Sequence, residues 1–422
     1  MADAAVAAVD EDSGNPSSQE RNEKLNQCID IAIEQFSVPR LEATRRNAEI
    51  ALRFVKSLTE KLNDIDPRLL DCFGSSLGHD VPRERLRSEG SPNQFYYRLM
   101  LDIERDSSLF QVTTFARDIN LPDMTATVKM KNVDAAKNAS NDSKLSTWQE
   151  FLCDKGYLVP SSFTDMLQEA VDNTLMIYGD EFEMVSIHEK SPHVTLRIVN
   201  GENSVFVKIV PSVLCYGLPQ GTRLPPKWPN HPHAKGRSKT FVKGIHSDVN
   251  SGQSLWVIEG QVYKSPPGIV KVPAEDLVPK LWSVSIDVLE DKFLDGVKKD
   301  DVEEEEVRKY RHHILQLFFA LREGQEAILQ GLTAKHLRTL LLWECNRHGD
   351  WSQDSAGERF LTMLQRLKDN LKLKTLQDFF YIDLNILCDL SASARRTMHI
   401  KVKHFLSAIL REPESIFHFL PH

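Results

Sequence analysis

The segment that most constrains this chain is a run of residues, 335–348, that reads KHLRTLLLWECNRH. Its apolar residues recur at intervals of three and four, the spacing that places side chains on one face of a helix. The residues on that face are Leu337, Leu340 and Leu341, with Glu344 one turn further along. The run therefore predicts a helix that packs its leucines against other helices.

Bulk composition narrows the class of protein. At 422 residues and 41% hydrophobic residues, the chain is long enough for two packed lobes. No apolar run approaches the ~18 residues that a membrane span needs. The N-terminus lacks the basic start of a secretory signal, and six scattered cysteines form no CxxC pair. We expect a protein of a reducing compartment, cytoplasmic and also nuclear, that does not contact membranes.

A net charge of −8 argues against general binding of nucleic-acid backbones. One basic stretch with a neighbouring aromatic residue, Trp228, is the exception and predicts an anion or nucleic-acid patch; its members are Lys227, Lys235, Arg237, Lys239 and Lys243. The alternative interpretation is an ordered surface loop. The acidic run at residues 300–306 is typical of a helix start, where acids meet the positive end of the helix dipole.

The order of patterns along the chain predicts three parts. Residues 1–20 are small, polar and acidic, and we expect them to be disordered. Residues 21–300 mix helices and strands, and residues 301–422 are helical almost throughout, with breaks near Gly331, Gly349 and residues 373–382.

Within the mixed part, two long segments, 95–103 and 194–213, alternate like strands, and the second holds a hairpin turn at Gly201. Helical spacing covers 25–62, where Pro39 divides the stretch or begins a helix. Shorter segments follow: helices at 146–153 and 161–177, then an insert at 218–279 rich in Pro, Gly and His, with strand signals at 255–263 and 268–272.

Together with Trp148 to Phe151, Trp282 and residues 381–387, the 335–348 run resembles the C-terminal helical half of the Mab-21 family. That family shares the nucleotidyltransferase fold of cyclic GMP-AMP synthase. The resemblance covers about residues 22–420. It implies an α+β, bilobal nucleotidyltransferase fold, in which helices flank a mixed β-sheet, followed by a C-terminal helical bundle.

The resemblance also says where catalytic acids belong. Nucleotidyl transfer needs carboxylates that converge on Mg²⁺, and in this fold a Gly-Ser pair precedes an acid-x-acid strand. Residues 73–77, FGSSL, supply Gly74 and Ser75, and residues 91–101, SPNQFYYRLML, resemble the acid-bearing strand. Its acid positions fall on Gln94 and Tyr96, and the third, on a later strand, falls on Phe206. No amide, phenol or phenyl ring replaces a charged oxygen ligand.

Other acids and possible metal ligands occur elsewhere in the chain. Asp102 and Glu104 form an acid-x-acid pair, but Asp102 lies eight residues beyond Gln94, or ~26 Å along an extended strand; a solvated strand end is the alternative. The zinc-binding insertion of the synthase has no counterpart near residues 297–313, which offer only His312 and His313. Cys345 and His348 lie one helical turn apart and have a spacing that could bind a metal. The alternative interpretation is a buried core thiol beside a surface histidine.

We therefore expect a catalytically inactive member of this group, acting through a protein partner, or by nucleotide binding without Mg²⁺, in signalling or development. The residues expected to meet the nucleotide are Gly74, Ser75, Lys208 and Lys335. No other cofactor and no metal is expected, and the cleft is either open or filled by side chains. The alternatives are an active transferase that senses nucleic acid, built on Asp102, Glu104, Glu181 or Glu183, and a nucleic-acid binder without catalysis.

Overall fold

A computed structural model describes the greater part of the chain. The described residues are 18–74, 86–101, 103, 110–114, 124–131, 147–189, 193–225, 228, 237–250, 254–260, 275–295 and 302–421. The predictions for residues 1–17 and 268–272, and for Asp102 and Glu104, therefore lie outside the described residues.

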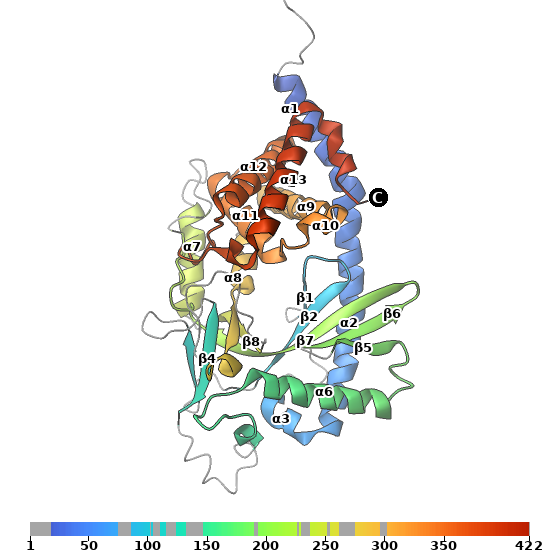
Figure 1. Ribbon diagram of the computed structural model, residues 1–422, viewed down its shortest axis with the longest axis vertical. Helices are drawn as coiled ribbons and strands as arrows, with labels where there is room; N and C mark the ends of the chain where they lie inside the picture. Colours follow the sequence, from blue (N-terminus) through green and yellow to red (C-terminus); the bar gives the residue numbers. More distant parts are fainter. Residues whose placement is uncertain are drawn as a thin grey trace, which may run out of the picture.

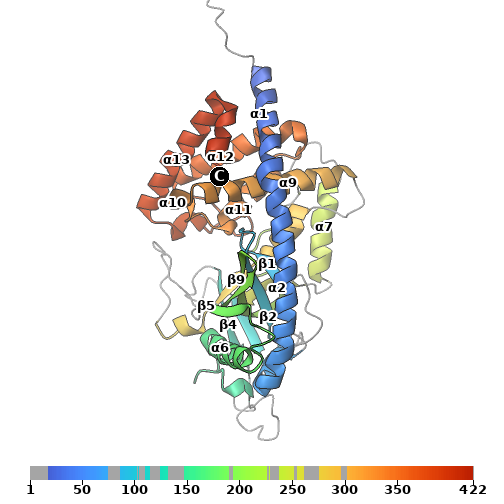
Figure 2. The ribbon, with the colours of Figure 1, turned by 90° about the vertical axis from the view of Figure 1, so that its right-hand side faces the viewer.

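The N-terminal half begins with one helical rod that runs along most of the molecule (Figures 1 and 2). The rod joins α1 (Ser18–Ala32), a π-helical turn (Ile33–Ser37) and α2 (Val38–Ile65). Pro39 lies in the first turn of α2, where a missing N–H costs least. The expected break is thus a π-helical joint in a continuous rod. A short helix, α3 (Pro67–Phe73), follows after the Asp66 cap.

A mixed β-sheet forms the centre of the lower lobe, in the order β1-β2-β7-β8-β9-β4-β3, with β6 and β5 branching from β7. Its strands are β1 (Leu86–Ser88), β2 (Gln94–Met100), β3 (Phe110–Thr114), β4 (Thr125–Met130), β5 (Val185–Glu189), β6 (Val194–Asn200), β7 (Asn203–Tyr216), β8 (Ser254–Glu259) and β9 (Trp282–Ser285). The β2–β7 pair is parallel and the other paired strands are antiparallel. Gly201, at φ +62°, makes the predicted hairpin turn between β6 and β7.

One face of the sheet is covered by helices α2 and α6 (Pro160–Ile177), which contact each other and β7 (Figure 1). Phe163 of α6 is fully buried and stacks on Phe151 at 4.4 Å between ring centroids. The predicted helix at 146–153 is only a single turn over residues 147–149, because Phe151 and its neighbours turn into this aromatic core.

The C-terminal part is helical, as predicted, and packs above the sheet with α1 against α12 (Figure 1). Helix α8 (Asp287–Asp295) precedes it, and its own helices are α9 (Val302–Gly324), α10 (Glu326–Leu329), α11 (Ala334–Arg347), α12 (Ala356–Leu373) and α13 (Ala392–Arg411). The leucines of α11 are buried, which confirms the core face read from their spacing. No helix among the described residues is long and apolar enough to cross a membrane.

The insert at 218–279 contains one helix that was not predicted from the sequence, α7 (Arg237–Asn250). Its Pro, Gly and His content suggested a loop, but Phe241, Val242 and Ile245 are buried and anchor one face of the helix. Packing against the rest of the chain, which a local pattern does not report, stabilises this helix.

Candidate ligand cleft

A cleft of about 960 Å³ lies between the sheet and the C-terminal helices. The turn before β2, the β9–α8 junction, the α9–α11 region and residues 384–389 line it. Strand β2 presents its two faces differently: Phe95, Tyr97 and Leu99 belong to the hydrophobic core, whereas Gln94 and Tyr96 point the other way and line the cleft. The strand thus carries side chains from the sheet into the cleft.

The three expected acid positions are brought together on adjacent strands. In the parallel register of β2 and β7, Gln94 stands beside Phe206 and Tyr96 beside Lys208. Phe206 packs its ring against His188 at 4.9 Å and does not line the cleft. The structure therefore brings Gln94 and Tyr96 to the cleft and leaves the Phe206 ring outside it.

Arg98 lies at the floor of the cleft and binds two carboxylates there; it was not predicted from the sequence. It is 1% exposed, and its Nε and Nη2 donate to Glu259 Oε1 at 2.9 and 2.7 Å. Nη2 also donates to Asp287 Oδ2 at 2.7 Å. Tyr96 donates its hydroxyl proton to the same Asp287 oxygen at 2.5 Å. The sequence signal for this site was a single charged residue on a strand of mostly aromatic and apolar residues. A buried charge needs a partner, so such a residue predicts a buried ion pair.

These contacts set the ionisation of the floor. Burial alone would raise the pKa of Asp287, but the charges of Arg98 and Arg87 hold that pKa well below its usual range. Burial, and then the negative charge of Asp287, raise the pKa of Tyr96. Asp287 is therefore a carboxylate bound by cations, and Tyr96 is a neutral hydrogen-bond donor.

The walls of the cleft repeat this pairing of acids with cations. Lys208 Nζ lies 2.8 Å from Glu89 Oε2. Lys335 pairs with the buried Glu290 and, at 2.7 Å, with Asp378 Oδ2. On the side of α8, Arg87 and Arg338 share Asp291. Each of these carboxylates already has a cation in contact with it.

The residues predicted to meet a nucleotide fall into three groups. Lys335 lines the cleft, and Lys208 contacts it through Glu89. Gly74 ends α3 with φ +44° and is not a lining residue. Ser75 lies outside the described residues. Of the four predicted residues, Lys335 therefore lies on the cleft wall and Lys208 lies at its edge.

The predicted basic patch is only partly described. Lys227 and Lys235 lie outside the described residues, and Arg237 and Lys239 belong to the first turn of α7, whereas Lys243 is exposed on that helix.

Trp228 is not the surface aromatic that the sequence suggested. It is 2% exposed, donates its indole N–H to the Phe293 carbonyl at 2.9 Å and packs on the Phe379 ring. The expectation that an aromatic side chain joins the basic patch is therefore wrong, because the tryptophan fills a core site.

The alternative ligands for a metal have other contacts. His312 Nε2 meets Asp295 Oδ1 at 3.1 Å, and His313 Nδ1 meets Ser37 Oγ at 2.8 Å. Cys345 is buried, which raises the pKa of its thiol to about 12. Within the described ranges no group of three or more His, Cys, Asp or Glu is arranged to hold a metal ion.

The acids of the alternative active site are placed only in part. Glu181 pairs with Lys61 at 3.2 Å, and neither Glu181 nor Glu183 lines the cleft.

The fold and a match over residues 88–258 to the family model of the Mab-21 protein nucleotidyltransferase domain define a protein of the nucleotidyltransferase fold class. Residues 308–404 match the model of the Mab-21 protein HhH/H2TH-like domain. The chain belongs to the Mab-21 family.

Similar proteins carry the same family name. The protein mab-21-like of Drosophila melanogaster is 24% identical over 377 residues, 85% of this chain and 88% of that protein. Its namesake from Aedes aegypti is 25% identical over 342 residues, 76% and 78% of the two chains. The similarity thus extends over most of both lobes.

Proposed function

We propose that this chain is a catalytically inactive nucleotidyltransferase-fold protein, acting in signalling or development through a protein partner or by binding a nucleotide without metal. The observation that carries the proposal is the set of side chains on strands β2 and β7, at and beside the floor of the cleft. Gln94, Tyr96 and Phe206 stand together at the positions that the resemblance assigns to the catalytic acids. None of the three side chains offers a charged oxygen to Mg²⁺.

The acids that remain on the floor support the same proposal. Glu259 and Asp287 are held by the buried guanidinium of Arg98. A divalent cation that took both carboxylates as ligands would compete with that guanidinium for their oxygens. Breaking a buried ion pair in this way costs several kcal/mol.

Metal-free nucleotide binding would use cations at the edges of the cleft rather than its floor. The side chain of Lys208 is 33% exposed and that of its partner Glu89 28%, so the pair can exchange with a phosphate more readily than a buried pair. Lys335 is half-buried but neutralised by two buried carboxylates. We place the phosphate contact at Lys208, with Lys335 supporting the wall.

The test is thermal unfolding of the full chain with millimolar ATP or GTP, with and without Mg²⁺ or Mn²⁺. A ligand that binds only the folded state raises the midpoint. We expect a rise that needs no metal and that disappears in Lys208→Gln but persists in Lys403→Gln, a control at an exposed position on α13. Stabilisation that requires metal, or a nucleotidyl product formed from ATP and GTP with double-stranded nucleic acid present, would contradict the proposal. No shift with any nucleotide would leave the protein partner as the function.

A further inference from the structure

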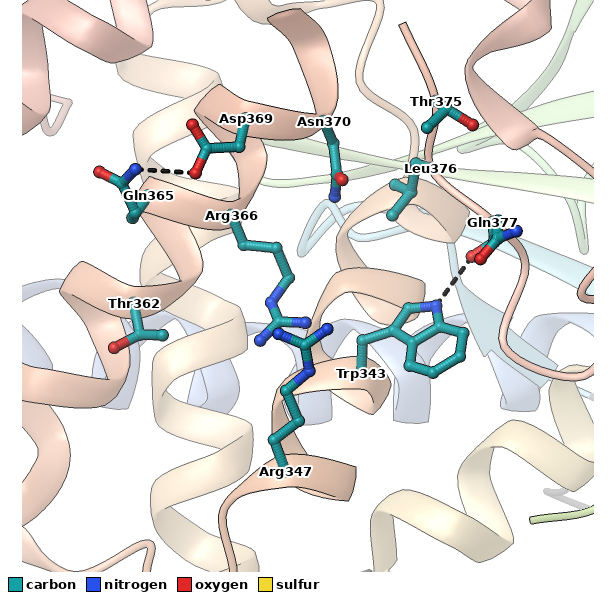
Figure 3. A pocket seen from close by; sticks show the side chains of 10 residues that line it. All are labelled: Trp343, Arg347, Thr362, Gln365, Arg366, Asp369, Asn370, Thr375, Leu376 and Gln377. Carbon is teal, nitrogen blue, oxygen red and sulfur yellow. Dashed lines mark hydrogen bonds between the residues drawn. The ribbon is translucent and has the colours of Figure 1, made fainter. Parts of the chain in front are cut away.

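A second, smaller cavity of about 350 Å³ lies between α11, α12 and residues 375–377 (Figure 3). It shares no lining residue with the cleft. Lys335 lines the cleft near the start of α11, and Arg347 lines the second cavity at its end. This separation along the helix corresponds to about 18 Å at 1.5 Å per residue. The cavity is therefore a separate place on the molecule.

Two arginines meet in this cavity. Arg347 from α11 and Arg366 from α12 place their guanidinium groups next to each other (Figure 3). The Arg366 side chain is 13% exposed, and its Nη2 lies 2.7 Å from Glu344 Oε2, while its Nε is buried without a hydrogen-bond partner. Arg347 is exposed and forms no ion pair or hydrogen bond with any residue that the structure describes.

The acids nearby do not balance this positive charge. Glu344, fully buried, takes Arg366 as its partner. Asp369, on the cavity wall, lies 3.4 Å from Lys368, and Glu358 lies 3.5 Å from Arg359. Burial lowers the pKa of Arg366, and the charge of Arg347 lowers it further against the opposing pull of Glu344. One positive charge is left over where two guanidinium groups adjoin, and an anion in the cavity would compensate it.

The remaining walls are fixed and of mixed character. The Trp343 indole donates its N–H to the Gln377 carbonyl at 2.8 Å and packs edge-on against Phe379 at 5.0 Å. Its position beside the arginines is thereby held (Figure 3). Asp369, the acidic lining residue, accepts a hydrogen bond from the Gln365 amide at 2.7 Å (Figure 3). The cavity thus combines cations with a flat, immobilised aromatic wall.

We propose that this second cavity binds a small phosphomonoester, with its phosphate on Arg347 and Arg366 and an attached ring against Trp343, as in a nucleoside monophosphate. Guanidinium groups match phosphate oxygens with paired N–H donors. A volume of about 350 Å³ is within the range of small-molecule sites. This site goes beyond the function proposed for the cleft, since it uses none of the cleft residues.

Isothermal titration calorimetry with AMP and with inorganic phosphate tests the site on the full chain. We expect both to bind, AMP more tightly because phosphate alone has no ring to place on Trp343. Arg347→Gln removes an exposed side chain and leaves the buried Arg366–Glu344 pair intact. It should weaken AMP binding about tenfold or more, the size of a lost charged hydrogen bond.

Two controls make the result specific. Arg396→Gln removes the same charge from an exposed position on α13, outside the cavity, and should leave the affinity unchanged. Lys208→Gln alters the cleft and should also leave it unchanged. The proposal is overturned by absent AMP binding at millimolar concentration, by an unaffected Arg347→Gln, or by an equal loss in Arg396→Gln. A loss in Lys208→Gln alone would assign AMP to the cleft, so the two sites fail independently.

Discussion

Arg98 and Glu259 stand 161 residues apart in the chain and form a buried ion pair with two hydrogen bonds to one carboxylate oxygen. Arg98 extends from β2 and Glu259 from β8, and the same guanidinium holds Asp287 at the start of α8. The guanidinium therefore links the two strands that flank β7 to the first helix above the sheet.

Replacing Arg98 by methionine should lower the free energy of unfolding by about 3–5 kcal/mol, because it leaves Glu259 and Asp287 buried without their cation. The matched control is Arg45→Met on α2. The Arg45 side chain is 77% exposed and its partner Glu49 lies 3.6 Å away, so the loss there should be about 0.5 kcal/mol or less. Urea denaturation measures both, and equal losses would mean that the pair contributes little.

Lys335→Met should destabilise the protein more at pH 8 than at pH 5. Burial raises the pKa of Glu290, and the Lys335 ammonium opposes that rise. Without the ammonium, both Glu290 and Asp378 lose a cation, and the folded pKa of Glu290 rises further. A group with a raised folded pKa is neutral and tolerated at low pH, and the cost of burying its charge grows as pH rises. Denaturation curves of variant and wild type at the two pH values give the difference; a deficit independent of pH would argue against this account.

Two glycine-to-alanine changes should have opposite effects. A Cβ at Gly324 would lie 2.5 Å from the Phe419 carbonyl oxygen and 2.7 Å from the Leu420 carbonyl carbon, so it would push the C-terminal backbone off α9. We expect a loss of about 1–3 kcal/mol. A Cβ at Gly244 in α7 meets nothing within 4 Å, so alanine there should stabilise the protein by up to about 1 kcal/mol. Melting temperatures that move in the same direction would contradict this packing.

Acid should weaken the joint in the N-terminal rod through His313. Burial, followed by the charges of Lys309 and His312, lowers the pKa of His313 to about 4. The unfolded imidazole, with a pKa near 6.5, binds a proton more readily, so protonation favours unfolding. The stabilisation, on the order of 3 kcal/mol, is complete above pH 6.5 and is lost as pH falls toward 4.

The measurement for His313 is the slope of stability against pH between 7 and 4 in wild type and in His313→Gln. The variant should have the shallower slope. His399→Gln, at a half-buried position on α13, serves as the comparison for removing a histidine elsewhere. If His313→Gln follows the wild-type curve, protonation of this side chain does not couple to folding.

The division of the chain into residues 21–300 and 301–422 remains a proposal about domains. The elements themselves complicate a simple division, because α1 contacts α12 and so joins the C-terminal helices, whereas α2 contacts the strands. The rod therefore links both parts, and limited proteolysis between residues 295 and 302 would show whether they separate.

Local sequence patterns located several helices and one turn, and they identified Gln94 and Tyr96 among the residues that line the cleft. Apolar spacing located α11 and α6, glycine located the β6–β7 turn, and the alternation of β7 placed Phe206 and Lys208 on one face. These features depend on neighbours a few residues away, so a local pattern carries them.

Which charges meet, and which aromatic side chains are buried, depends on the packing of the whole chain. Arg98 pairs with Glu259 and Asp287. Trp228 is buried in the core, and Arg347 lies beside Arg366. Each outcome joins residues that are distant in sequence, because the cost of burying a charge is met by whichever partner the packed chain brings within hydrogen-bond distance. A periodic pattern contains no information about that partner.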